Sequence, residues 1–167
     1  MNRENHTSVI LRVLKSVILF ISSGLFIGFI PVGPGTAGSI LGIVMWVLLS
    51  NSKFFLLYIF ITITLAIVFS WYAERFIFRK KDPQQVVIDE IAGILITFSL
   101  FKFSDDIKGL IIVILGFIFF RIFDILKPPP IKISQRLRGG FGIVVDDLIA
   151  GAYSCLLLFL IMKLINY

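Results

Sequence analysis

The stretch FRIFDILKPPPIKISQRLRGGFGIVVDD, residues 120–147, decides the fold. It lies between two long apolar runs, 107–127 and 144–165, and three consecutive prolines after Lys127 stop the first of them. Eight ionisable side chains gather in it: Arg121, Asp124, Lys127, Lys132, Arg136, Arg138, Asp146 and Asp147. Each such side chain costs about 3 kcal/mol at the centre of a membrane helix. A cluster of them at the ends of apolar helices therefore indicates a functional site.

The composition predicts an integral membrane protein. Hydrophobic residues make up 58% of the chain and the mean hydropathy is +1.02, while charged residues are 16%, against roughly 25% in soluble domains. The net charge of +6 comes from basic residues in short loops between apolar runs. This distribution favours anionic lipid headgroups over nucleic acid as the partner. We expect one membrane-embedded domain over residues 1–167.

Six apolar runs predict an all-α, polytopic membrane bundle. They cover residues 16–30, 40–49, 54–71, 86–103, 107–127 and 144–165. The first two are short and are predicted as short or half-spanning helices. If all six cross the membrane, the loops 31–39, 72–90 and 127–147 lie on one face, and both termini lie on the other. Every unusual polar motif then shares a face, as a single site requires.

An internal repeat links two of the runs. VVIDEIAG at residues 86–93 aligns with VVDDLIAG at residues 144–151 and matches Asp89 with Asp147. Repeats in membrane proteins often build one site from two helices. The Ala-Gly pair in each repeat would let the two helices approach closely.

Two adjacent acidic pairs open these two runs: Asp89 with Glu90, and Asp146 with Asp147. One acid per helix start is explained by the helix dipole. Two adjacent acids repel each other unless a cation or a proton intervenes. Paired carboxylates are typical ligands of Mg²⁺, which usually also binds substrate phosphate. We therefore predict a metal site formed by these four residues.

Phosphate-binding groups surround the acids in the sequence. Arg121 and Lys127 flank Asp124 at spacings of three residues, which gives internal salt bridges or, beside a metal, an anion site. Gly35, Thr36 and Ser39 belong to an uncharged glycine loop before an apolar run. Such a loop is typical either of a turn or of an anion cradle at a helix start.

The sequence lacks the residues that histidine, cysteine and zinc chemistry would need. His6 is the only histidine and lies far from any motif, and Cys155, the only cysteine, lies inside an apolar run. A Ser-His-Asp triad and a zinc site are therefore not expected, and no intramolecular disulfide is possible. Metal and carboxylate chemistry remains, in which activated water attacks phosphorus while Arg and Lys stabilise the charge.

The chain resembles the phosphatidylglycerophosphatase A family of bacterial membrane lipid phosphatases, from about residue 28 to residue 151. Four ordered blocks carry the resemblance: Pro31-x-x-Pro34-Gly35-Thr36-x-Gly38-Ser39; Asp82-Pro83 leading to Ile88-Asp89-Glu90-x-x-Gly93; Phe120-Arg121-x-Phe123-Asp124-x-x-Lys127-Pro128-x-Pro130-Ile131; and Gly140-x-Gly142-Ile143-x-x-Asp146-Asp147-x-x-Ala150-Gly151. The resemblance implies Mg²⁺-dependent removal of the terminal phosphate from phosphatidylglycerophosphate. It also implies a site that faces the cytosol at the bacterial plasma (inner) membrane.

The sequence and the resemblance together predict a role for each residue. The expected metal ligands are Asp89, Glu90, Asp146 and Asp147. The expected catalytic residues are Asp89, Glu90, Asp124 and Asp147. The expected substrate-binding residues are Gly35, Thr36, Ser39, Arg121 and Lys127. Two alternatives stay open: another lipid-headgroup phosphotransferase, such as a CDP-alcohol transferase, and a small cation-binding transporter.

Charge also bears on orientation. Basic residues on the predicted site face favour the cytosol: Arg75, Arg79, Lys80, Lys81, Lys132, Arg136 and Arg138. Arg3, Arg12 and Lys15 oppose this if the first apolar run spans the membrane. A first run that only enters the interface would remove the conflict.

Overall fold

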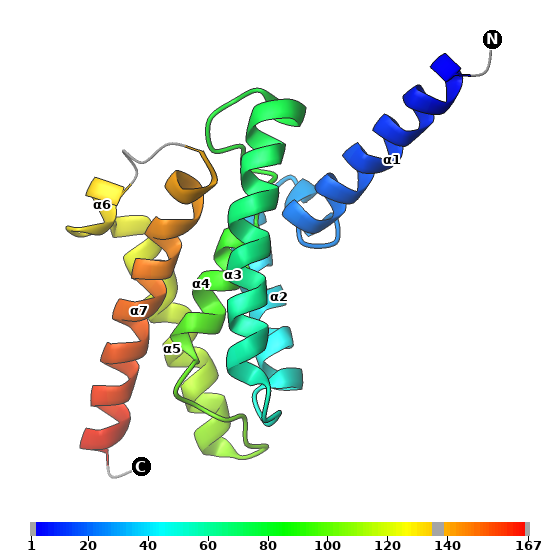
Figure 1. The fold of residues 1–167 in the computed structure, drawn as a ribbon. Helices are drawn as coiled ribbons and strands as arrows, with labels where there is room; N and C mark the ends of the chain where they lie inside the picture. The colour runs from blue at the N-terminus through cyan, green and yellow to red at the C-terminus, as the bar shows by residue number, and fades with distance from the viewer. Residues whose placement is uncertain (1–2, 135–138, 166–167) are drawn as a thin grey trace.

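The computed structural model describes residues 3–134 and 139–165, and within these residues it contains helices and no strand (Figure 1). The elements are α1 (Arg3–Ser22), the 3-10 turn η1 (Ile27–Phe29), α2 (Pro34–Leu49), α3 (Phe55–Tyr72), the π-helical η2 (Ala73–Phe78), α4 (Ile88–Thr97), α5 (Ile107–Leu126), α6 (Ile131–Ser134) and α7 (Gly140–Leu164). The all-α prediction is confirmed. Arg136 and Arg138, two of the predicted loop charges, lie outside the described residues.

Three helical segments are long and apolar enough to cross a membrane: Phe55–Phe78, Ile107–Leu126 and Gly140–Leu164. The first of these is α3 continued by η2. Helix α2 is also apolar but has only 16 residues, about 24 Å at 1.5 Å per residue, which is short for a membrane core of about 30 Å. The prediction of about six apolar helices is therefore confirmed in part.

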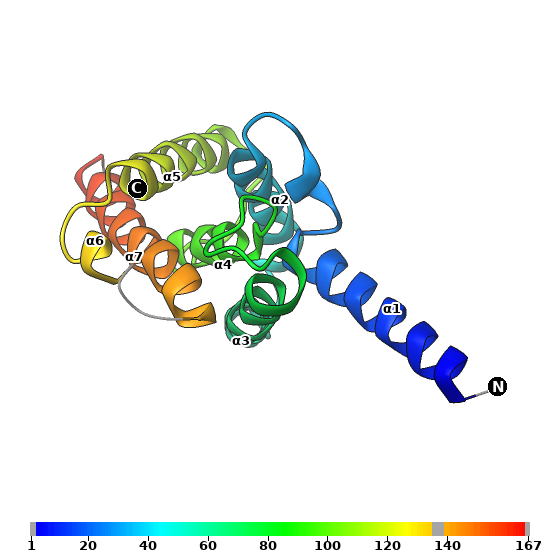
Figure 2. The ribbon, with the colours of Figure 1, turned by 90° about the horizontal axis from the view of Figure 1, so that it is seen from above.

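Helix α4 forms the centre of the bundle. It packs against α2, α3, α5 and α7, which surround it in the view along the bundle (Figure 2). Eight of its ten residues are buried. Such a helix does not contact lipid, and its sequence is apolar because protein covers it on every side.

The helix predicted over residues 86–103 is wrong in extent, because α4 ends at Thr97. Its cap residue, Phe98, stacks on Trp46 with ring centroids 4.5 Å apart. Beyond it the chain is not helical and is held by α2, since the Trp46 indole donates to the carbonyl of Phe101 at 3.2 Å. Irregular backbone at membrane depth is tolerated where protein buries it. The stacking of Phe98 on Trp46 accompanies the end of the helix, where the sequence pattern predicted further turns.

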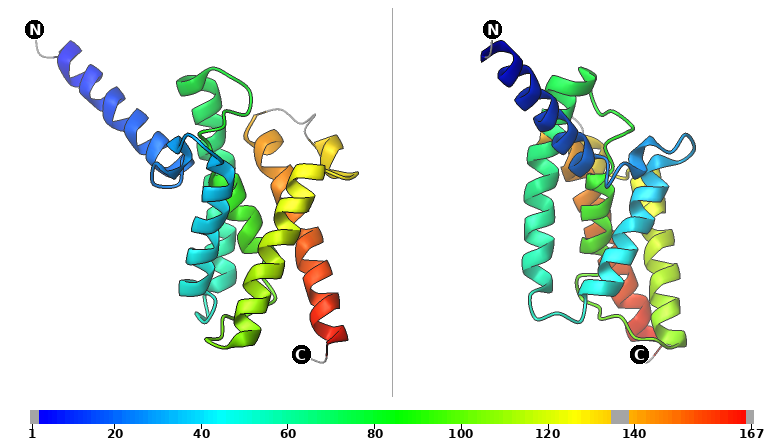
Figure 3. Two further views of the ribbon diagram at one scale, coloured as in Figure 1. Left: turned by 180° about the vertical axis from the view of Figure 1, so that it is seen from behind. Right: turned by 90° about the vertical axis from the view of Figure 1, so that its right-hand side faces the viewer.

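The helix predicted over residues 16–30 is also wrong in extent. Helix α1 starts at Arg3 and ends at Ser22, and the chain then turns at Leu25 and Phe26, both with positive φ. The helix projects away from the bundle and meets α3 and η2 only near its end (Figures 1 and 2). The start of α1 therefore lies towards the end of the bundle where α7 begins, opposite the end of α7 (Figure 3), and not on the face opposite the polar loops.

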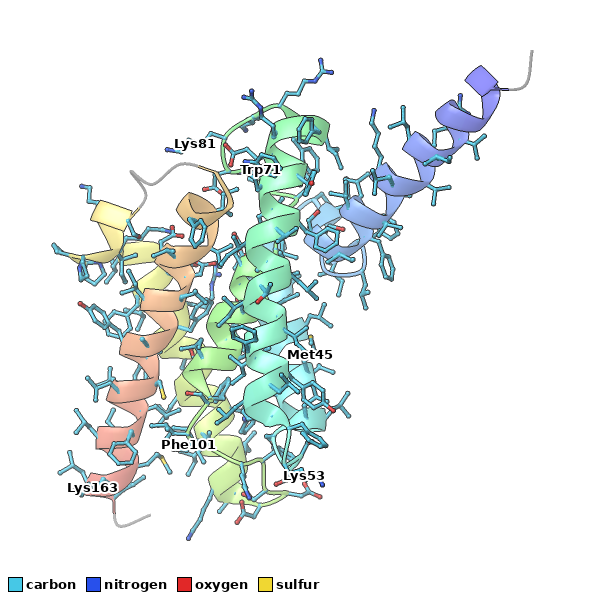
Figure 4. All side chains as sticks on the ribbon, viewed as in Figure 1. Met45, Lys53, Trp71, Lys81, Phe101 and Lys163 are labelled. Atoms are coloured by element: carbon cyan, nitrogen blue, oxygen red, sulfur yellow. The ribbon has the colours of Figure 1, made fainter. Side chains whose placement is uncertain are left out.

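The polar loops gather at one end of the bundle, as predicted. Loop 31–33, loop 82–86 and the start of α7 contribute residues to one cavity. Lys81 and Trp71 mark this end, and Lys53 and Lys163 mark the other (Figure 4). Below, the first is called the site end.

The two repeats pack directly on each other. A Cβ atom on Gly151 would collide with the backbone oxygen of Gly93. One on Gly93 would meet the Phe120 ring and, at 2.8 Å, the backbone oxygen of Asp147. The close approach of α4 and α7, expected from the Ala-Gly pairs, is confirmed.

We expect Gly151→Ala to lower the free energy of unfolding by about 1–3 kcal/mol, because a backbone oxygen cannot yield as a flexible side chain can. The measurement is thermal unfolding in detergent. Ala152→Leu is the control, since Ala152 is exposed on the same helix and a larger apolar side chain there meets only lipid or detergent. Equal stability of Gly151→Ala and wild type would show that this contact is not needed.

Candidate active site

The glycine contact between α4 and α7 brings the acids of the two repeats together. Asp89 stands four residues before Gly93, and Asp147 stands four residues before Gly151. Residues four apart lie one turn apart on the same helix face. Asp89 and Asp147 therefore meet one turn above the contact, where they are 5% and 4% exposed.

Three carboxylates form a compact cluster there. Ligand oxygens of Asp89, Glu90 and Asp147 all lie within 4.8 Å of one another. Asp89 Oδ1 and Glu90 Oε2 are buried and have no hydrogen-bond partner. Buried anionic oxygens without donors are costly, and a divalent cation would satisfy them. The donor set, all carboxylate oxygens, fits Mg²⁺.

The fourth predicted ligand, Asp146, takes another position. Its Oδ2 lies 2.6 Å from Lys127 Nζ, and it does not belong to the three-carboxylate cluster. Lys127 also lies 3.4 Å from Asp124 Oδ1, and Arg121 lies 2.9 Å from Asp124 Oδ2. Positive and negative side chains therefore alternate from Arg121 through Asp124 and Lys127 to Asp146 on α7.

Burial alone would lower the pKa of the Lys127 ammonium, but its hydrogen bond to Asp146 and the charges of Asp146, Asp147 and Asp124 outweigh this and raise the pKa. Lys127 therefore keeps its positive charge at neutral pH. Because Lys127 is already paired with Asp124 and Asp146, a bound anion must share the ammonium with these carboxylates or displace them. The Lys127 ammonium is a suitable point charge for a phosphate oxygen.

The start of α2 covers the carboxylate cluster from one side. Pro34 occupies the first turn, and a Cβ atom on Gly35 would collide with Glu90 Oε1. Ser39 is fully buried; its hydroxyl donates to the Gly35 carbonyl at 2.9 Å and accepts from Arg121 Nη1 at 3.4 Å. A side chain at position 35 would push the Glu90 carboxylate from its place, because the helix backbone lies against it.

These groups line one cavity of about 580 Å³. The predicted residues on its wall are Gly35, Thr36, Asp89, Glu90, Arg121, Asp124, Lys127, Asp146 and Asp147. Ser39 does not line it and lies behind Gly35 as a support. The polar motifs of four distant segments therefore meet in one place.

The cavity wall also contains Asp82 and Gln84, to which the sequence analysis assigned no role. Partial removal from water raises the pKa of Asp82, and the charge of Asp146 adds to this effect. The pair Asp82-Pro83 in the second motif block was the signal that could have identified the first of them.

The chain is also similar to known proteins. The family model described as phosphatidylglycerophosphatase A matches residues 20–162. The chain belongs to the phosphatidylglycerophosphatase A family. It is therefore a lipid phosphatase, a phosphoric monoester hydrolase, and the resemblance seen in the motifs is confirmed.

Three curated relatives agree with this placement. Phosphatidylglycerophosphatase A of Escherichia coli is 32% identical over 80% of this chain and 77% of its own length. The Haemophilus influenzae protein of the same name is 29% identical over 89% of this chain and 90% of its own length. A Bacteroides thetaiotaomicron protein named "Putative phosphatidylinositol-3-phosphatase" is 34% identical over 84% of this chain and 90% of its own length. No solved structure matches the chain significantly.

We expect Gly35→Ala to reduce phosphatase kcat/KM by about tenfold or more, because the added methyl group displaces the Glu90 carboxylate. The measurement is phosphate release by purified protein. Val44→Ala is the control, since Val44 lies on the exposed face of the same helix. Full activity in Gly35→Ala would show that the position of Glu90 is not critical.

Proposed function

We propose that this protein removes the terminal phosphate from phosphatidylglycerophosphate in a Mg²⁺-dependent reaction, giving phosphatidylglycerol and inorganic phosphate. The observation that carries the proposal is the cluster of Asp89, Glu90 and Asp147 within 4.8 Å, in one cavity with Arg121 and Lys127. A metal and two cationic side chains around one anion are typical of phosphoryl transfer. The family supports the choice of lipid.

In this proposal Asp89, Glu90 and Asp147 hold the metal. Bound there, Mg²⁺ would polarise the phosphoryl group and make water more acidic. Asp146 is assigned a different role from the one its sequence position suggested: with Asp124 it positions Lys127, to which both carboxylates are paired. Proteins often orient such groups through a second layer of hydrogen bonds.

Arg121, Lys127 and the start of α2 bind the phosphate. The Arg121 and Lys127 side chains neutralise charge on its oxygens as the phosphoryl group is transferred. The Thr36 hydroxyl and the first N-H groups of α2, which lack acceptors within the helix, donate to the remaining oxygens. Asp124 orients Arg121, which it contacts at 2.9 Å.

The reaction is a hydrolysis in which one bond is exchanged. The oxygen of water forms a bond to phosphorus while the bond from phosphorus to the glycerol oxygen breaks. One proton of the water passes to a carboxylate of the cluster and then to the glycerol oxygen. The free alcohol and hydrogen phosphate then leave.

We also propose where the protein acts and how much of the chain forms the domain. The whole chain, residues 1–167, acts as one domain in the bacterial plasma membrane with its site end towards the cytosol. Arg75, Arg79, Lys80 and Lys81 lie at that end, and the start of α1 points to the same side of the bundle. This removes the conflict that a spanning first helix would create and supports the orientation through the positive-inside tendency.

We expect purified protein to release phosphate from phosphatidylglycerophosphate with Mg²⁺, and EDTA to abolish the release. Phosphatidic acid is the control lipid. Phosphatidylinositol-3-phosphate is the second candidate substrate, because the name of the Bacteroides relative points to it. No release from any lipid by folded protein would contradict the proposal, and ion flux without release would favour a transporter.

We expect Asp89→Asn and Asp147→Asn each to lower kcat by about 10²–10³ or more, because each removes a charged ligand from the cluster. Binding of Mn²⁺, followed by its paramagnetic signal, should weaken in parallel. Asp105→Asn is the control, since Asp105 is exposed at the opposite end. Activity near that of wild type in both cluster variants would remove these residues from the mechanism.

A further inference from the structure

We propose that the acyl chains of the substrate lie between α2 and α5, so that the lipid enters the site sideways from the bilayer over a rim formed by Ile40 and Ile118. The inference rests on the proposed function, since it takes the phosphate of a membrane lipid to be held in the cavity. It adds a binding site for the apolar part of that lipid.

The position of the cavity is the first observation. Pro34, Gly35 and Thr36 line it from the start of α2, and Arg121 and Asp124 line it from the end of α5. Among the described residues, α1, α3 and α6 contribute nothing to its wall. The rest of the wall comes from loops 31–33 and 82–86, Lys127, α4 and α7, so α2 and α5 are two of the four helices around a phosphate held there.

The second observation is the arrangement of α2 and α5. Helix α5 packs along α7 and meets α2 only over a short stretch. Near the cavity, the hydrogen bond from Arg121 to Ser39 joins them. Their site ends stand apart in the view from behind (Figure 3, left).

Along α2 and α5, the side chains near the cavity change from polar to apolar with distance from the site end. Ile40 is one turn deeper than Thr36 on α2, and Ile118 is three residues deeper than Arg121 on α5, about 4–6 Å at 1.5 Å per residue. They are 52% and 43% exposed. A phospholipid has the same order, with an anionic head above apolar chains, so the rim matches the chains of a lipid whose head lies in the cavity.

A competing groove lies on the other side of α5. Phe123, Tyr153, Leu156, Leu157 and Leu160 line a hollow of about 220 Å³. The rings of Phe123 and Tyr153 pack edge to face with centroids 5.6 Å apart, and the Tyr153 hydroxyl donates to the Pro129 carbonyl at 3.3 Å. These contacts join α7 to α5 and to the loop after it, and none of the five groove residues lines the cavity, which favours the α2 side.

Photo-crosslinking tests the site directly. The probe is phosphatidylglycerophosphate with a diazirine in one acyl chain, added with Mg²⁺ to the full chain in lipid nanodiscs and photolysed at once on ice to limit turnover. We expect labelling of peptides that contain Ile40 and Ile118, and competition by unlabelled phosphatidylglycerophosphate but not by phosphatidylcholine. Competed labelling at Leu156–Leu160 instead, or labelling that phosphatidylglycerophosphate does not reduce, would overturn the inference.

Kinetics supply an independent test. Ile40→Trp and Ile118→Trp should lower the ratio of kcat/KM for a long-chain lipid to that for its dihexanoyl analogue by about tenfold. Leu48→Trp and Leu110→Trp are matched controls, because both residues are exposed on the same helices, eight residues further from the site. The same ratio in rim and control variants would refute the lateral route. Absence of phosphate release by wild type would instead refute the proposed function.

Discussion

The backbone contact between α4 and α7 is the constraint on which the rest of the structure depends. Gly93 and Gly151 leave no room for a Cβ atom between the two helices. One turn above, the same contact forces the buried carboxylates of Asp89 and Asp147 together, and Glu90 joins them. Close carboxylates in a low-dielectric site repel strongly unless a cation or protons lie between them. The packing that stabilises the bundle therefore also creates a cluster that needs a cation or bound protons.

The cavity joins this acidic cluster to a cationic wall. Arg121 on α5 and Lys127, which caps the end of that helix, share Asp124, and Lys127 reaches across to Asp146 on α7. Each cation is held by carboxylates before any ligand arrives, so its position is set in advance. Such preorganisation is valuable for phosphoryl transfer, because the protein need not reorganise as charge moves to the phosphate oxygens.

Sequence patterns predicted most of the site because its chemistry is local. Acidic pairs at helix starts, basic residues at a helix end and a glycine loop can each be recognised within one segment. Asp82 and Gln84 were not assigned, because their place in the cavity depends on the path of a loop. The extent of α4 was wrong for a similar reason: the apolar pattern continues past Thr97, but stacking of Phe98 on Trp46 ends the helix.

The sequence by itself determined that this is an all-helical membrane protein and named most of the charged residues that line the cavity, since hydropathy and charge are properties of the residues. Only the tertiary structure decided which neighbours each of two adjacent acids contacts. Neighbouring residues on a helix point about 100° apart. Asp147 therefore faces α4 and joins the cluster, while Asp146 faces Lys127 on α5. That division depends on which helix packs on each side of α7, and no local pattern encodes it.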